Sequence, residues 1–212
     1  MLVALLLSCA DPAATVTPAA TVPTAPAAPV APAPVPVTAS EGAPLVATGT
    51  VRFEAAKVTR AHIGNFGDWS GSLRMNGDTL AGVEVEVRMA SIETDVAKLD
   101  HHLKSDDFFG VEAFPVARFV STEVRAGAPP DNKLADANAT VVGDLTIHGV
   151  TKRLEVPAVV TVAGDEVHAR TEFSIDRHDF GVSYPGKPDD LIRAGVVLRV
   201  DLAATRAGAT GG

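Results

Sequence analysis

The stretch GDLTIHGVTKRLEV, residues 143–156, contains two runs of alternating apolar and polar residues separated by a glycine. Leu145 and Ile147 share one face of the first run, and Leu154 and Val156 share one face of the second. Alternation with a period of two is typical of a strand that is buried on one face. The stretch predicts a hairpin with its corner at the glycine, although a histidine in that place can also be a catalytic or metal-binding group.

The same alternation recurs from Thr48 onward. In LAGVEVEVRMAS, residues 80–91, the alternation places Val83, Val85, Val87 and Met89 on one face and charged residues on the other. A Gly-Asp turn inside EVPAVVTVAGDEVHARTEF predicts a second hairpin. We expect about eight antiparallel strands, for which an up-and-down barrel and a two-sheet sandwich are the alternative architectures.

One segment breaks this pattern with helical spacing. ETDVAKLDHHLKSDDFF, residues 93–109, carries Val96, Leu99 and Leu103 at intervals of three and four. Thr94 or Asp95 offers a side-chain oxygen to cap the first amides. We expect one inserted helix of roughly three turns that covers an end or side of the sheet.

The net charge and the cysteine content of the chain limit the partners and metal sites that it can have. The chain has 212 residues, a formal net charge of −8 and one cysteine. An acidic chain repels phosphate backbones, so we expect no nucleic-acid partner. A single cysteine excludes an internal disulfide framework and any multi-cysteine metal site.

The first nine residues are apolar up to Ser8 and end in the chain's single cysteine, Cys9. Residues 1–9, MLVALLLSC, resemble a lipoprotein signal peptide, which implies cleavage before Cys9 and acylation of its thiol. No Lys or Arg precedes Arg52, so we expect that the start is misassigned and upstream residues are lost. The alternative is an apolar N-terminus with an incidental cysteine. Acylation would anchor the protein in the bacterial cell envelope, facing the periplasm or the outside.

The segments that flank the expected barrel lack its pattern. Nine of the 15 prolines lie in residues 10–46, so we expect a disordered Pro/Ala-rich linker that acts as a spacer. The barrel itself is expected over 47–207, followed by a flexible tail at 208–212.

Four stretches carry a family resemblance in their order and spacing. These are AKVTRAHIGNFGDWSGSL (56–73), ASIETDVAKLDHHLKSDDFFGVEAFPVARFVST (90–122), VVGDLTIHGVTKRLEVPA (141–158) and FSIDRHDFGV (173–182). Together they resemble the YceI-like family of polyisoprenoid-binding periplasmic and secreted bacterial proteins. The resemblance implies an eight-stranded lipocalin-like barrel with an elongated apolar pore, and a long isoprenoid, fatty acid or fatty amide as the ligand.

The inward faces and the aromatic residues give the expected ligand-binding residues of the lumen. They are Phe66, Trp69, Val85, Val87, Met89, Phe108, Phe119, Leu145, Ile147, Val160, Phe173 and Leu198. Binding of an apolar chain needs no catalytic residue, no metal and no cofactor, and we expect none. The expected partners are a long-chain lipid and, through Cys9, a membrane; the oligomeric state stays open, with a homodimer as one alternative.

The histidines carry the rival hypothesis. His62 precedes a glycine turn and is a candidate for contact with a ligand head group. A periplasmic redox accessory enzyme linked to a metal or quinone would use His62, His148 or His178. His101 and His102 are adjacent on the expected helix and point about 100° apart, which is unfavourable for sharing one ion.

Overall fold

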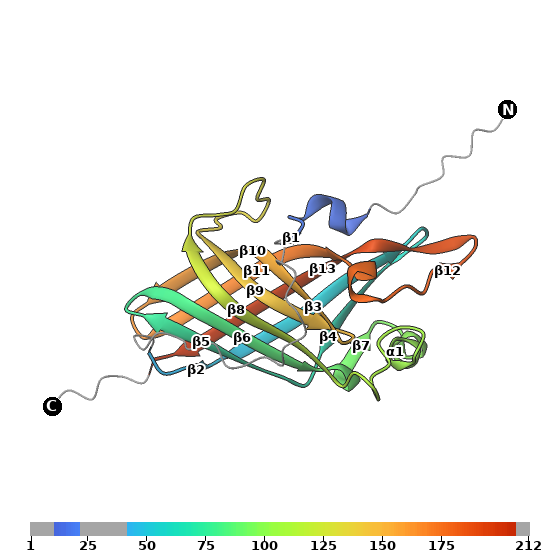
Figure 1. The fold of residues 1–212 in the computed structure, drawn as a ribbon, viewed down its shortest axis with the longest axis horizontal. Helices are drawn as coiled ribbons and strands as arrows, with labels where there is room; N and C mark the ends of the chain where they lie inside the picture. The colour runs from blue at the N-terminus through green and yellow to red at the C-terminus, as the bar shows by residue number, and fades with distance from the viewer. Residues whose placement is uncertain (1–10, 22–41, 207–212) are drawn as a thin grey trace, which may run out of the picture.

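The protein is mainly β-structure with one α-helix. The computed structural model describes residues 11–21 and 42–206 (Figure 1). The strands within this part are β1 Ala20–Thr21, β2 Leu45–Val46, β3 Thr48–Lys57, β4 Ala61–Phe66, β5 Trp69–Asn76, β6 Thr79–Arg88, β7 Ile92–Thr94, β8 Val116–Ala126, β9 Ala139–Ile147, β10 Val150–Ala163, β11 Glu166–Asp176, β12 Gly186–Lys187 and β13 Asp190–Thr205. The helix is α1 Ala97–Lys104, and the 3-10 helices are η1 Pro12–Thr15, η2 Met89–Ser91 and η3 Arg177–Phe180. The predicted fold class is confirmed.

The sheet curls so that strands near its two ends follow one another directly along the chain. Its order is β2-β5-β6-β8-β9-β10-β11-β13-β3-β4-β7. β2 pairs with β5, and β3 pairs with both β13 and β4, yet only Ala47 separates β2 from β3 along the chain. Likewise β4 continues into β5, and β6 continues through η2 into β7. The described residues therefore build thirteen strands where we predicted eight. Eight long strands, which we call staves, form the barrel, and short breaks divide three of them into two strands each. β1 and β12 are additional.

The hairpin at residues 143–156 forms as the alternation predicts. β9 and β10 pair Ile147 with Val150, which leaves His148 and Gly149 as a two-residue turn. Both have positive φ, 50° and 73°, as a type I′ turn requires. The ring of His148 packs edge-on against Phe114, with centroids 4.4 Å apart. His148 is therefore a hairpin corner.

The helix is shorter than expected and begins differently. α1 has eight residues, and its N-cap is Val96, which makes no side-chain cap bond. The predicted cap by Thr94 or Asp95 is wrong: the Thr94 hydroxyl and amide instead donate to Asp100 Oδ1, at 2.6 and 2.7 Å. Within the described ranges, no helix is long and apolar enough to cross a bilayer.

Part of the expected linker belongs to the wall of the barrel. Residues 11–21, which we call the N-terminal strap, contain η1 and β1 and lie outside β10, β11 and β13 (Figure 1). Leu45 and Val46 form β2. The expectation of a disordered segment over 10–46 is wrong for these residues, because strand edges of the barrel supply hydrogen-bond partners that the local sequence lacks. Residue 10 and residues 22–41 lie outside the described part, as do Cys9 and the tail.

Candidate functional site: an apolar lumen

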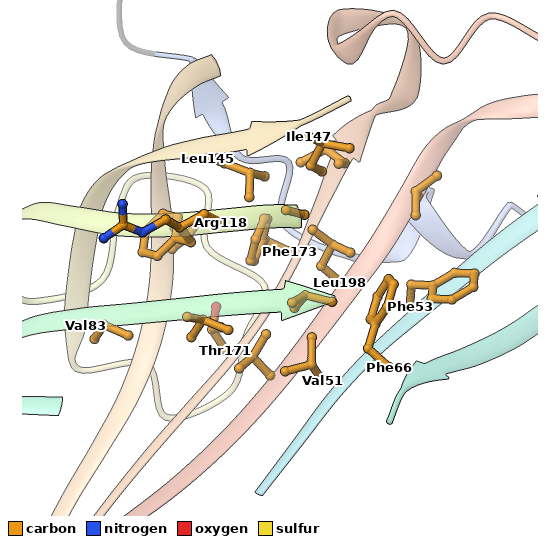
Figure 2. Close-up of a pocket in the computed structure, with 18 of the residues that line it drawn as sticks. Val51, Phe53, Phe66, Val83, Arg118, Leu145, Ile147, Thr171, Phe173 and Leu198 are labelled. Atoms are coloured by element: carbon orange, nitrogen blue, oxygen red, sulfur yellow. The ribbon is translucent and has the colours of Figure 1, made fainter. Parts of the chain in front are cut away.

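The barrel encloses a cavity of about 170 Å³, called the lumen here. Figure 2 shows apolar side chains from several staves converging on it. Its lining residues are Val51, Phe53, Phe66, Leu80, Val83, Val85, Val87, Met89, Ile92, Phe109, Ala117, Arg118, Phe119, Val141, Leu145, Ile147, Val156, Ala158, Ala169, Arg170, Thr171, Phe173, Ile175, Arg177, Phe180, Val182, Val196, Leu198, Val200 and Leu202. This lining follows from the alternation, which turns every second residue of each stave inward.

Four polar residues take part in the lining, namely Arg118, Arg170, Thr171 and Arg177. Arg170 is an exposed residue, and the polar groups of the other three bond to other parts of the protein. Arg118 extends away from the apolar side chains and bonds Glu84 (Figure 2). The Thr171 hydroxyl donates to the Pro157 carbonyl at 2.6 Å. The surface that faces the lumen is therefore mainly apolar.

Arg177 is a buried cation in the wall of the lumen. Its guanidinium donates to the carbonyl oxygens of Arg193, Val182 and Ile192, at 3.1, 2.6 and 3.3 Å. Burial lowers the pKa of Arg177, and the charge of neighbouring Asp176 offsets part of that effect. An arginine stays charged in proteins, so these three carbonyls solvate it and tie η3 and the following loop to the start of β13.

Two rings of the lumen lie over glycines of neighbouring strands. Phe53 of β3 pairs with Gly64 of β4, and a Cβ at Gly64 would lie 2.3 Å from Phe53 Cζ. In the same way, a Cβ at Gly143 of β9 would lie 2.5 Å from Phe119 Cζ. An aromatic ring that covers a cross-strand glycine lies along the wall, as in aromatic rescue of strand glycines. The two glycines thus keep both rings from crossing the cavity.

A second apolar cluster closes the barrel near α1. Phe53, Ile92, Leu103, Phe108 and Val182 are buried there together. Around Phe108, the rings of His102 and Tyr184 lie with centroids 4.9 and 5.0 Å away. α1 and the loop before β12 therefore cap this end of the lumen.

A family model of the YceI-like domain matches residues 45–204. The chain belongs to the YceI-like family. A UPF0312 protein of Pseudomonas savastanoi pv. phaseolicola is 34% identical over 131 residues, which are 58% of this chain and 65% of that protein. The chain thus spans just under two thirds of the length of this curated relative.

Solved YceI-like structures share the fold. BcnA of Burkholderia cenocepacia aligns with a TM-score of 0.62 at 22% identity, covering 73% of this chain and 96% of that one. A polyisoprenoid binding domain from Saccharophagus degradans, implicated in plant cell wall breakdown, aligns with a TM-score of 0.59 at 16% identity, covering 78% and 98%. At these identities the likeness establishes the fold alone.

Most of the predicted lining residues of this YceI-like barrel face the lumen. Those that do are Phe66, Val85, Val87, Met89, Phe119, Leu145, Ile147, Phe173 and Leu198. Trp69, Phe108 and Val160 do not. Phe108 packs into the cluster at α1, whereas Trp69 and Val160 are partly buried against the main core beside the cavity.

Several lumen residues escaped the sequence analysis. Phe180 and Val182 lie in η3 and the loop after it, where no alternation exists to assign a face. Val51 and Phe53 sit on one face of an alternating run, TVRFEA, so the signal for them was present. Ile92 follows a 3-10 turn that interrupts the period of its stave.

His62 does not line the lumen in this structure. Its Nδ1 lies 2.7 Å from Asp95 Oδ1, and Arg60 bonds the other oxygen of the same carboxylate. The hydrogen bond with His62 and the nearby Arg60 charge lower the pKa of Asp95, although its partial desolvation acts in the opposite direction. Contact of His62 with a ligand head group stays a prediction.

The other histidines named by the rival hypothesis have separate surroundings. His178 Nδ1 lies 2.9 Å from Asp176 Oδ1, while His148 packs on Phe114 at the turn between β9 and β10. Among the residues that the structure describes, no three His, Cys, Asp or Glu side chains gather as a metal site.

Proposed function

We propose that the protein binds, stores or transports a polyisoprenoid or another long-chain amphiphile in its lumen, without catalysing a reaction. The observation that carries this proposal is the lining, in which apolar side chains surround the cavity. Of the four polar lining residues, Arg118 pairs with Glu84 at the surface, Arg170 is exposed, and Thr171 and Arg177 bond to main-chain carbonyls. The polyisoprenoid-binding domain among the structural neighbours supports the same ligand class.

The energetics favour a hydrocarbon chain. An isoprene unit has five carbons, so its transfer from water yields about 4 kcal/mol at about 0.8 kcal/mol per methylene-sized group. Loss of rotational and translational freedom offsets a large part of this gain. Two or three buried units would still give useful affinity without one hydrogen bond to the protein.

Extraction of the purified protein tests the proposal. We expect mass spectrometry of an organic extract to show a long-chain lipid in near-stoichiometric amount. Leu145→Trp fills the lumen and should abolish that signal, whereas Leu191→Trp, at a side chain that is 49% exposed outside the lumen, should retain it. A barrel that is empty after purification and takes up no prenyl chain in vitro would refute the function.

The same preparation tests the rival hypothesis of a metal- or quinone-linked accessory enzyme. That hypothesis requires stoichiometric metal or a visible chromophore, lost on changing His62, His148 or His178 to Ala. We expect neither from freshly purified protein.

We further propose that Cys9 is acylated and anchors the protein in a bacterial membrane. Asp11, two residues later, lies 3.7 Å from Arg193 of β13. Two residues span at most about 7 Å, so the anchor would hold the η3 end of the barrel close to the bilayer. Cys9→Ser should release the protein from membranes, and unchanged membrane association would count against the anchor.

A further inference from the structure

The wall of the barrel divides between β10 and β11. β10 pairs with β11 only over Val159–Ala163, whereas its earlier residues, 150–158, pair with β9. On the other side of the division, residues 171–176 of β11 pair with β13 and have no register partner in β10. Pro157 stands where the division begins, and a proline has no N–H to give to a strand ladder.

The N-terminal strap fills this division. On one side, Ala20 and Thr21 pair with Glu155 and Leu154 of β10. On the other, the Ala19 amide donates to the Ser174 carbonyl, and the Ser174 amide donates to the Thr17 carbonyl, both at 2.8 Å. The strap therefore supplies main-chain hydrogen bonds to both edges, as a short additional stave.

β13 is shaped to receive the strap. A Cβ at Gly195 would lie 2.4 Å from the Cβ of Ala13, and the next nearest atoms, Asp11 Oδ1 at 3.8 Å and Ala13 Cα at 3.9 Å, also belong to the strap. Val197, two residues on, is fully buried although its neighbours Val196 and Leu198 are the ones that line the lumen. η1 packs on β13, so the strap covers an apolar strip on the outside of the barrel.

A second cavity of about 290 Å³ lies where the strap meets β10, β11 and η3. Pro18, Ala19 and Thr21 of the strap form one side of this side cavity. Ile175 and Phe180 line both the side cavity and the lumen. These two side chains therefore stand between the side cavity, which the strap borders, and the lumen.

The lumen is small for the proposed ligand. Its volume of about 170 Å³ is close to the roughly 150 Å³ of an engineered protein cavity that binds one benzene molecule. A chain of several isoprene units needs more room than this. The strap is held by main-chain bonds at a few residues, by the ion pair of Asp11, by hydrogen bonds that Lys133 donates to the Thr17 hydroxyl and the Ala14 carbonyl, and by one buried apolar side chain, Val16. These contacts are fewer than those of a long paired strand, so release of the strap costs less than opening a continuous ladder.

We infer that the N-terminal strap is a removable stave that closes a lateral opening into the lumen, through which a long apolar chain enters between β10 and β11. This inference rests on the proposed function and assigns the route of the same ligand. The strap pairs with β10 and β11 in the barrel without ligand. It leaves the division between them when the apolar chain of the ligand passes Ile175 and Phe180.

A reversible lock tests the inference in the full chain carrying Cys9→Ser. Ala20→Cys with Glu155→Cys places two thiols at register partners, within reach of a disulfide. Uptake of cis-parinaric acid, a long-chain fatty acid that fluoresces in apolar sites, is followed by stopped flow. We expect uptake by the oxidised protein to be at least tenfold slower than by the same protein after reduction.

Displacement of the strap gives the opposite change. Gly195→Val clashes with Ala13, whereas the control Gly67→Val places its Cβ 4.0 Å from the Ser91 carbonyl oxygen, an ordinary contact distance. We expect Gly195→Val, but not the control variant, to take up the probe faster. In Gly195→Val the Ser174 amide should lose its protection from hydrogen exchange, while the amides of β9 keep theirs. Retained protection of Ser174 in Gly195→Val would show that the strap is not seated there and would count against the inference.

The outcomes separate the route from the function. Equal uptake rates for the oxidised and reduced proteins, with normal equilibrium binding, would overturn the lateral route and leave the proposed function standing. Absence of equilibrium binding of the probe to every variant would overturn both.

Discussion

The rings of Phe53 and Phe66 lie side by side at the α1 end of the lumen, with centroids 5.5 Å apart and planes tilted by 43° (Figure 2). Phe53 can take this position because Gly64 beneath it has no side chain. We expect Gly64→Ala to push the Phe53 ring into the cavity and weaken probe binding at least tenfold. Titration with cis-parinaric acid measures the change. Gly67→Ala is the control, because a Cβ there has the Ser91 carbonyl oxygen as its nearest neighbour, at 4.0 Å. Unchanged affinity with an intact fold would refute the role of Gly64.

Leucines of the core and of the lumen should differ in their contribution to stability. Leu73 is fully buried and does not line the lumen, so Leu73→Ala should cost about 3–5 kcal/mol of unfolding free energy. Leu145 borders the cavity and has fewer atoms around it, so Leu145→Ala should cost less. Urea unfolding of ligand-free protein measures both. Equal losses would argue that the lumen is filled by neighbouring side chains in solution.

Removal of the Arg177 guanidinium should destabilise the barrel. Arg177→Met would leave the carbonyls of Arg193, Val182 and Ile192 without this donor, at a cost of about 3–5 kcal/mol. Arg118→Met, at an exposed ion pair, should change stability by about 1 kcal/mol or less. Denaturant unfolding monitored through Trp69 compares the two variants. A small effect of Arg177→Met would mean that water replaces the guanidinium.

Asp95 should contribute to the pH dependence of stability in acid. Its pKa is lowered in the folded state, so its ionised form favours folding. That contribution is fully present above the unfolded pKa of about 3.9 and is lost as the pH falls through the lowered folded value. Thermal unfolding at pH 7 and pH 3 should therefore show a smaller acid-induced drop in Tm for Asp95→Asn than for the natural chain. Identical drops would contradict this assignment.

The alternation of residues was enough to predict the staves and most of the lumen, because the inward face of a strand depends only on its own period. Val85, Leu145 and Leu198 were assigned in this way. Trp69 and Phe108 are aromatic residues near strand or helix ends, where no period gives a direction, and neither lines the lumen. Their placement depends on packing between distant segments.

The strap could not be predicted from its composition. A segment rich in Ala, Thr and Pro has no amphipathic face, and proline normally excludes it from a sheet. Its structure depends on a division of the wall that opens at Pro157 and on the missing side chain of Gly195, both more than 100 residues away along the chain. Long-range register of this kind has no local signal.

The strap also changes what counts as the folding unit of this protein. The family match begins at residue 45, after the strap, so a fragment cut there would keep the recognised domain and lose one stave. The facing edges of β10 and β11 would then present unpaired main-chain groups, which is the template for strand exchange and aggregation between molecules. The boundary drawn by sequence similarity therefore passes through the wall of the barrel, and a soluble fragment of this chain should start before Asp11.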